Sequence, residues 1–101
     1  MPDEGPITSE FANDPDMAIL IAEFVASLPK HTHTILERIE QGANEQARTM
    51  AHQLKGAGGG YGFPLVTDAA RVVELAIREK RMDDARTAAK ALITLCARVV
   101  S

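Results

Sequence analysis

Apolar residues recur at helical spacing through the first forty residues, and this feature constrains the fold most strongly. Met17 and Ile35 lie eighteen residues apart, which is about five helical turns, and so do Ile21 and Ile39. The stripe contains Met17, Leu20, Ile21, Phe24, Val25, Leu28, Thr32, Ile35 and Ile39. Two separate helices would have no reason to keep this phase, so the pattern predicts one long helix over residues 15–41.

Residues with known conformational preferences mark the limits of this helix. Asp14 is predicted to be its N-cap, with Pro15 at the first helical position. Pro29 would ordinarily interrupt a helix, but the apolar phase continues across it, so a bend is expected there. Gly42 is expected to end the helix, because glycine readily adopts the left-handed conformation that follows a helical C-terminus.

Three shorter amphipathic segments follow. The second helix is predicted to be capped by Asn44 and to close at Gly62-Phe63-Pro64, the third spans residues 65–80, and the fourth spans residues 84–100 after a turn at Arg81-Met82-Asp83. The predicted buried residues are Ala47, Met50, Ala51, Leu54, Gly58 and Tyr61 in the second, Leu65, Ala69, Val72, Val73, Ala76 and Ile77 in the third, and Ala85, Ala88, Ala89, Leu92, Leu95, Cys96 and Val99 in the fourth. Four such helices with short connections predict an all-α, antiparallel four-helix bundle.

The length of 101 residues predicts one domain. The chain has no Trp, one Tyr and three Phe, so its core is aliphatic, which favours a helical bundle over a β-sandwich. Residues 1–6, rich in Pro and acids, are expected to be a flexible tail, and residues 7–101 the bundle. Thr8 or Ser9 is expected to cap a short extra N-terminal helix that carries Ile7 and Phe11.

Charge and composition exclude several classes of function. A net charge of −3 gives the chain no electrostatic reason to bind nucleic acid or an anionic membrane. The longest apolar run, residues 17–22, is too short to span a bilayer, and the acidic N-terminus does not resemble a signal peptide. Cys96 is the only cysteine, which excludes an internal disulfide and a cysteine-based zinc site. A soluble, cytoplasmic protein is therefore expected.

The residues best suited to a chemical role lie around His52 in the predicted second helix. On a helical wheel, His52 lies almost opposite the buried stripe. Gly56 and Gly59 fall on either side of it, and Arg48 and Lys55 lie just beyond. The exposed face therefore combines an imidazole, two residues without side chains and two cations.

The glycines in this segment need a reason, because each glycine within a helix costs about 0.5–1 kcal/mol relative to alanine. One interpretation is that the helix ends at Gly56 and a loop follows. The other is that a bare helix face lets the backbone of a second protein reach His52. Gly58 faces inward on the wheel, where it would allow close helix packing.

An imidazole is neutral and nucleophilic near pH 7, which suits it to accept a phosphoryl group. A phosphorylated imidazole is strongly anionic, and the ammonium of Lys55, one turn further along, would offset that charge.

The segment Ala51-His52-Gln53-Leu54-Lys55-Gly56, the run of small residues to Tyr61-Gly62-Phe63, and residues 70–74 resemble histidine-containing phosphotransfer (HPt) domains. The Phe24, Leu28 and Pro29 positions resemble the long first bundle helix of that family, and the likeness extends more weakly over residues 8–98. HPt domains are four-helix bundles that carry a phosphoryl group on one exposed histidine between the aspartates of receiver domains in multistep phosphorelays.

The resemblance implies a role for several residues. His52 would be the phosphoacceptor, Lys55 would stabilise the phosphoryl oxygens and Gly56 would leave room for the receiver. Glu74 stands where the family more often has glutamine, and its carboxylate is a candidate to fix the imidazole tautomer and to raise the basicity of the attacking nitrogen. Its alternative role is a solvated helix charge paired with Arg78.

The implied partners are response-regulator receiver domains and a hybrid sensor kinase, with the chain itself a monomer. No cofactor is expected: Mg²⁺ belongs to the receiver, and the chain lacks an ATP-binding motif, so it is not expected to be a kinase. Arg48, Gly59, Ile19, Phe11 and Ile7 are predicted to border the receiver contact, although the apolar three would serve equally to pack on one another. The alternative functions are an unphosphorylated helical adaptor that binds receiver or kinase domains and, less favoured, a small enzyme.

Overall fold

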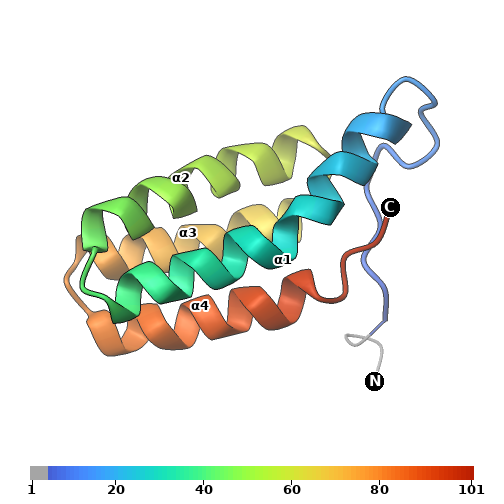
Figure 1. The fold of residues 1–101 in the computed structure, drawn as a ribbon. Helices are drawn as coiled ribbons and strands as arrows, with labels where there is room; N and C mark the ends of the chain where they lie inside the picture. Colours follow the sequence, from blue (N-terminus) through green and yellow to red (C-terminus); the bar gives the residue numbers. More distant parts are fainter. Residues whose placement is uncertain (1–4) are drawn as a thin grey trace.

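Four helices follow one another along the chain, joined by connections of three residues each. The computed structural model describes residues 5–101, and its helices are α1 (Ala18–Glu40), α2 (Asn44–Gly60), α3 (Pro64–Arg78) and α4 (Met82–Cys96). Each helix packs against its neighbour in the chain, and α4 also packs against α1 (Figure 1). Within the described residues, no Cα atoms of α2 and α4 lie within 8 Å of each other, so these two helices lie diagonally across the bundle. The predicted antiparallel four-helix bundle is confirmed.

The long first helix is continuous through Pro29, as the apolar phase predicts. Its buried residues are Ile21, Phe24, Leu28, Thr32, Ile35 and Ile39. The predicted start was wrong by three residues. The carboxylate of Asp14 accepts a hydrogen bond of 2.9 Å from the backbone N–H of Asp16, so it caps a turn that precedes the helix, and Met17 is the N-cap. The bend at Pro29 stays a prediction.

All three connections use the same tight turn. Residues 42, 62 and 80 adopt a positive φ, and the next residue donates its backbone N–H to the carbonyl five residues before it: Ala43 to Arg38, Phe63 to Gly58 and Arg81 to Ala76, at 2.7–2.9 Å. This turn uses so few residues that Asn44 and Met82 are already helical. The predicted N-cap at Asn44 was therefore wrong: Ala43 is the N-cap of α2 and Arg81 that of α4.

Helix α3 buries Val73, Ala76 and Ile77 as predicted, but the rest of its core face differs from the prediction. Its buried residues are Val66, Ala70, Val73, Glu74, Ala76 and Ile77. Leu65 and Val72, both predicted to be buried, are 50% and 57% exposed. The predicted stripe left out Val66, Ala70 and Glu74, which lie on the side of α3 adjacent to Val73 and Ile77. The actual orientation carries Glu74 inward between α3 and α2.

The N-terminal segment does not form the predicted short helix: residues 5–17 contain turns and one isolated β-bridge. Ile7 pairs in parallel with Val99, donating its N–H to the carbonyl of Arg98 at 2.8 Å. Ser9 Oγ donates to the carbonyl of Tyr61 at 2.6 Å. These hydrogen bonds hold residues 5–9 across one end of the bundle. Ser9 Oγ also accepts the backbone N–H of Phe11 at 2.9 Å, so Ser9 caps a turn there, but the turn does not continue into a helix.

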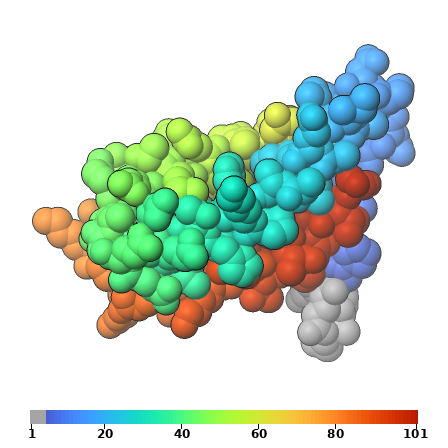
Figure 2. Space-filling view, in the orientation of Figure 1, coloured from blue at the N-terminus to red at the C-terminus, as the bar shows by residue number. Residues whose placement is uncertain are grey.

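Both ends of the described chain lie side by side at this end of the bundle, as Figure 2 shows in blue and red. Residues 1–4 of the predicted tail lie outside the described residues, and the carbonyl of Gly5 accepts a hydrogen bond from the Arg98 side chain at 3.0 Å. The division into a tail over residues 1–6 and a bundle over residues 7–101 stays a prediction. Among the helices of residues 5–101, none has the length and apolarity needed to cross a membrane.

Candidate functional site

Helix α2 continues through the whole glycine run to Gly60, so the interpretation that it ends at Gly56 is wrong. Gly58 is buried, and a Cβ at this position would lie 2.8 Å from Thr67 Oγ1 and 2.9 Å from the Thr67 backbone nitrogen. Thr67 Oγ1 also donates a 2.7 Å hydrogen bond to the carbonyl of Lys55. The missing side chain of Gly58 therefore lets α3 approach α2 closely beside the candidate site.

The sequence predicted close packing at Gly58 but did not identify Thr67 as its partner. The inward direction of Gly58 was visible from the helical wheel. The residue that it meets depends on the register between α2 and α3, and a single-sequence wheel does not contain that register.

The surface beside His52 is bare. A Cβ at Gly56 or Gly60 would meet nothing within 4 Å, and one at Gly59 would meet only Thr67 Oγ1 at 3.5 Å. Gly56 is exposed and follows His52 by one turn on the same helix. A second protein can therefore approach the α2 backbone here without displacing a side chain.

The imidazole of His52 faces solvent, with its side chain 61% exposed. Its Nδ1 atom lies 2.8 Å from Glu74 Oε2. Because a carboxylate only accepts hydrogen bonds, this contact assigns the ring proton of a neutral imidazole to Nδ1. The Nε2 atom then keeps a free lone pair, which is the arrangement that a nucleophile requires.

Glu74 binds two partners at once from a buried position. Its side chain is only 5% exposed, and its Oε1 atom forms an ion pair with Lys55 Nζ at 2.8 Å. The alternative of a solvated carboxylate paired with Arg78 is therefore wrong. The Lys55 ammonium holds the pKa of Glu74 below its ordinary value of 4.5, burial opposes this shift, and the contact with His52 adds to it.

This shift predicts a pH dependence of stability. A carboxyl whose pKa is lower in the folded than in the unfolded chain stabilises the fold above its unfolded pKa, and this contribution is lost as the pH falls through the folded value. We expect the wild type to have a larger free energy of unfolding than Glu74→Gln above the ordinary pKa of this carboxyl, because the ionised Glu74 is the form that the fold stabilises. The difference should shrink below pH 4.5, the ordinary value of this group. Urea unfolding at several pH values measures it, and a gap that does not shrink on acidification would contradict this role.

The other residues predicted to border the receiver contact differ in their exposure and in their partners. Arg48 forms a bidentate pair with Glu45 at 2.9 and 2.8 Å, which raises the pKa of its guanidinium, and the Glu74 carboxylate adds a smaller contribution. Ile7 is only 9% exposed and packs in the core, so its assignment to a partner contact was wrong. Phe11 and Ile19 are 39% and 74% exposed. Their role, like those of Arg48 and Gly59, stays a prediction.

Other reactive side chains do not form a second site. Among residues 5–101, no three His, Cys, Asp or Glu side chains lie close enough together to hold a metal ion. Cys96 is buried, and burial raises the pKa of its thiol to about 11. This thiol is therefore protonated near neutral pH and unsuited to nucleophilic attack.

Comparison with known proteins identifies one family. The family model of the Hpt domain matches residues 19–101, which include all of α2, α3 and α4 and nearly all of α1. The chain has no significant match among curated proteins and none among solved structures. Hpt domains are phosphocarriers rather than kinases, and they interact with receiver domains and kinases in phosphorelays. The match spans well over half of the chain and contains the exposed His52 with its carboxylate and ammonium partners, so the chain belongs to the Hpt domain family.

Proposed function

We propose that His52 accepts a phosphoryl group from an aspartyl phosphate of one receiver domain and passes it to the aspartate of another. The observation that carries this proposal is the exposed imidazole whose Nδ1 is held by a buried carboxylate. Such a ring presents one nitrogen, Nε2, as a nucleophile in a fixed orientation. The bare surface at Gly56 supports the proposal, because a receiver must bring its aspartate within bonding distance of that nitrogen.

The proposed transfer is an in-line displacement at phosphorus. The lone pair of Nε2 forms the N–P bond while the bond between phosphorus and the aspartyl oxygen breaks, and the aspartate leaves as a carboxylate. The proton on Nδ1 stays in its hydrogen bond to Glu74, so no base is needed. In the second half of the relay the N–P bond breaks, and the imidazole leaves in its original tautomer.

Lys55 is the proposed electrostatic partner of the phosphoryl group. Its side chain is 28% exposed, and its ammonium is already bound to Glu74 Oε1, which holds it within one turn of His52. A phosphoryl group on Nε2 adds negative charge near this ammonium. The Lys55 ammonium then stabilises two negative groups, the buried carboxylate of Glu74 and the oxygens of the phosphoryl group. Between transfers, its ion pair with Glu74 keeps the ammonium beside His52.

Several further features belong to the same proposal. The chain holds no cofactor of its own, and the Mg²⁺ that assists transfer is bound by the receiver. The phosphoryl group enters the relay through a hybrid sensor kinase. The chain acts as a monomer in the cytoplasm, and Gly59, Arg48, Phe11 and Ile19 border the receiver contact around His52.

A phosphotransfer assay tests the proposal. The protein is incubated with receiver domains from the same organism that have been loaded with labelled phosphate. We expect the label to move to this chain in a form that acid removes and base preserves, as is typical of phosphohistidine. Stable binding to the receivers without any transfer of label would contradict the proposal and would favour the alternative, an adaptor that is not phosphorylated.

A further inference from the structure

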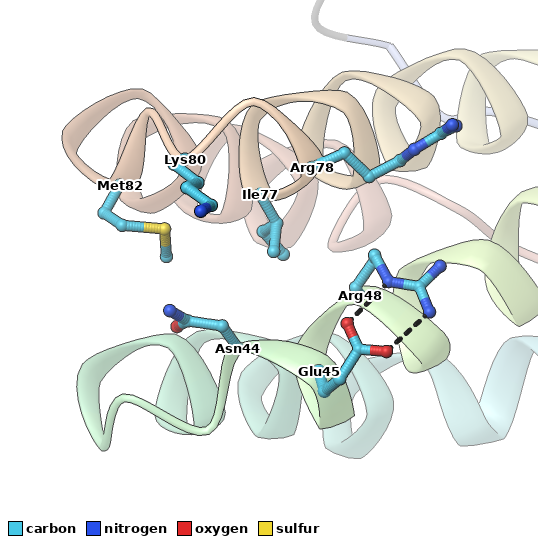
Figure 3. Close-up of a pocket in the computed structure, with 7 residues that line it drawn as sticks. All are labelled: Asn44, Glu45, Arg48, Ile77, Arg78, Lys80 and Met82. Carbon is cyan, nitrogen blue, oxygen red and sulfur yellow. Dashed lines mark hydrogen bonds and ion pairs between the residues drawn. The ribbon is translucent and has the colours of Figure 1, made fainter.

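A cationic pocket lies between α2 and α3, at the end of the bundle opposite the chain ends. Its volume is about 470 Å³. It is lined by Asn44, Glu45, Arg48, Ile77, Arg78, Lys80 and Met82 (Figure 3). In Figure 3, Ile77, Lys80 and Met82 point from α3, the α3–α4 connection and α4 toward α2. Three helices and a connection thus contribute to one depression.

The charge of this pocket differs from that of the whole chain. The chain has a net charge of −3, whereas the pocket is lined by three cationic residues and one acidic residue, with the guanidinium of Arg78 extending along α3 away from Met82 (Figure 3). Glu45 is already engaged by Arg48. Within residues 5–101, neither Arg78 nor Lys80 forms an ion pair, so their charges remain available to a ligand from outside. The pocket therefore favours an anion.

The floor of the pocket restricts the kind of anion. Ile77 is only 6% exposed, and together with Met82 it provides an apolar surface beneath the cations. A carboxylate on an aliphatic side chain matches both the apolar floor and the cations above it. Its methylene groups cover Ile77 and Met82, and its carboxylate reaches the cationic side chains. A glutamate side chain has this form, whereas a free phosphate would leave the apolar floor uncovered.

The pocket lies within reach of a protein docked on His52. Arg48 precedes His52 by four residues on α2, about 6 Å along the helix, and Asn44 precedes it by eight, about 12 Å. A typical interface buries about 800 Å² on each partner, a patch roughly 30 Å across. A partner centred on the imidazole therefore also covers the pocket.

We propose that this pocket receives an acidic side chain of the receiver domain and so sets the orientation in which the receiver docks on His52. The inference rests on the proposed phosphotransfer function and adds a contact that is remote from the reacting atoms. Complementary charges at such a position mainly increase the rate of productive encounter, and salt weakens their effect.

Charge reversal at Lys80 tests the pocket. We expect Lys80→Glu to lower the second-order rate constant for transfer from a phosphorylated receiver by about tenfold at low salt, and by much less at 0.5 M salt, where the Debye length is only about 4 Å. Arg78→Glu combined with Lys80→Glu should lower it further. The matched control is Lys90→Glu, an exposed residue on α4, which lies diagonally across the bundle from α2, and it should stay within about twofold of the wild type.

A small phosphodonor separates docking from chemistry. Phosphoramidate phosphorylates imidazoles without a protein partner, so its reaction with His52 should proceed at the wild-type rate in Lys80→Glu. An equal loss with phosphoramidate and with the receiver would overturn the inference, because Lys80 would then act on the imidazole itself. An equal loss in Lys80→Glu and Lys90→Glu would also overturn it, since only net charge would matter. Wild-type protein that phosphoramidate labels but no receiver does would instead contradict the proposed function.

Discussion

His52→Gln is expected to abolish phosphoryl acceptance completely while leaving the bundle folded. No other imidazole replaces this one, because His31 and His33 lie on α1 and neither contacts Glu74 or Lys55. The side chain of His52 is 61% exposed, so the substitution creates no cavity. Glu74 loses one hydrogen bond and keeps Lys55, which costs about 1 kcal/mol of unfolding free energy. Transfer of labelled phosphate and thermal unfolding measured on the same preparation check both statements.

The matched control for this substitution is His33→Gln, which removes another exposed imidazole. It should accept label at the wild-type rate. Residual acid-labile label on His52→Gln would show that a second histidine is an acceptor. A fall in melting temperature of more than about 10 °C would show that His52 is a structural residue, since 1 kcal/mol shifts the midpoint of a domain of this size by about 4–8 °C.

Gly58→Ala is expected to destabilise the protein by about 1–3 kcal/mol, although alanine is the better helix former. The added Cβ would lie 2.9 Å from the backbone nitrogen of Thr67, and a backbone atom cannot turn away as a side chain can. The two helices must therefore separate, which also strains the hydrogen bond from Thr67 Oγ1 to Lys55. Unfolding by urea measures the loss.

Gly56→Ala provides the opposite result in the same helix. Nothing lies within 4 Å of its Cβ position, so the substitution keeps all contacts and should stabilise the protein by about 0.5–1 kcal/mol. The same substitution at two positions only two residues apart is thus expected to change the free energy of unfolding in opposite directions. Equal changes in stability would show that α2 and α3 are not in close contact at Gly58.

The sequence was sufficient to predict the helices and the exposure of His52, because both depend on periodicity within one helix. The phase from Met17 to Ile39 identified α1, and the wheel position of His52 placed its ring in solvent. Neither inference needs to know how two helices are aligned. The helical wheel also predicted correctly that Gly56 is exposed and that Gly58 faces inward.

The errors arose where two segments determine each other's position. Part of the core face of α3 was missed because Glu74 is a buried carboxylate, and its burial depends on the ammonium of Lys55 and the imidazole of His52, both on α2. Ile7 was assigned to a partner contact because its pairing with Val99, more than ninety residues away in the chain, leaves no local pattern. Long-range partners of this kind are invisible to helical periodicity.

The closure of the bundle by Ile7 and Val99 has a consequence for tethered partners. The same segment also bonds to Tyr61 and Gly62, just beyond α2, so both ends of the described chain lie near that end of α2. His52 lies eight residues before Gly60, about 12 Å along the helix. A receiver joined by a flexible linker at Gly5 or at Ser101 would start its search from nearly the same place, and linkers of equal length should give it nearly equal effective concentrations at the imidazole.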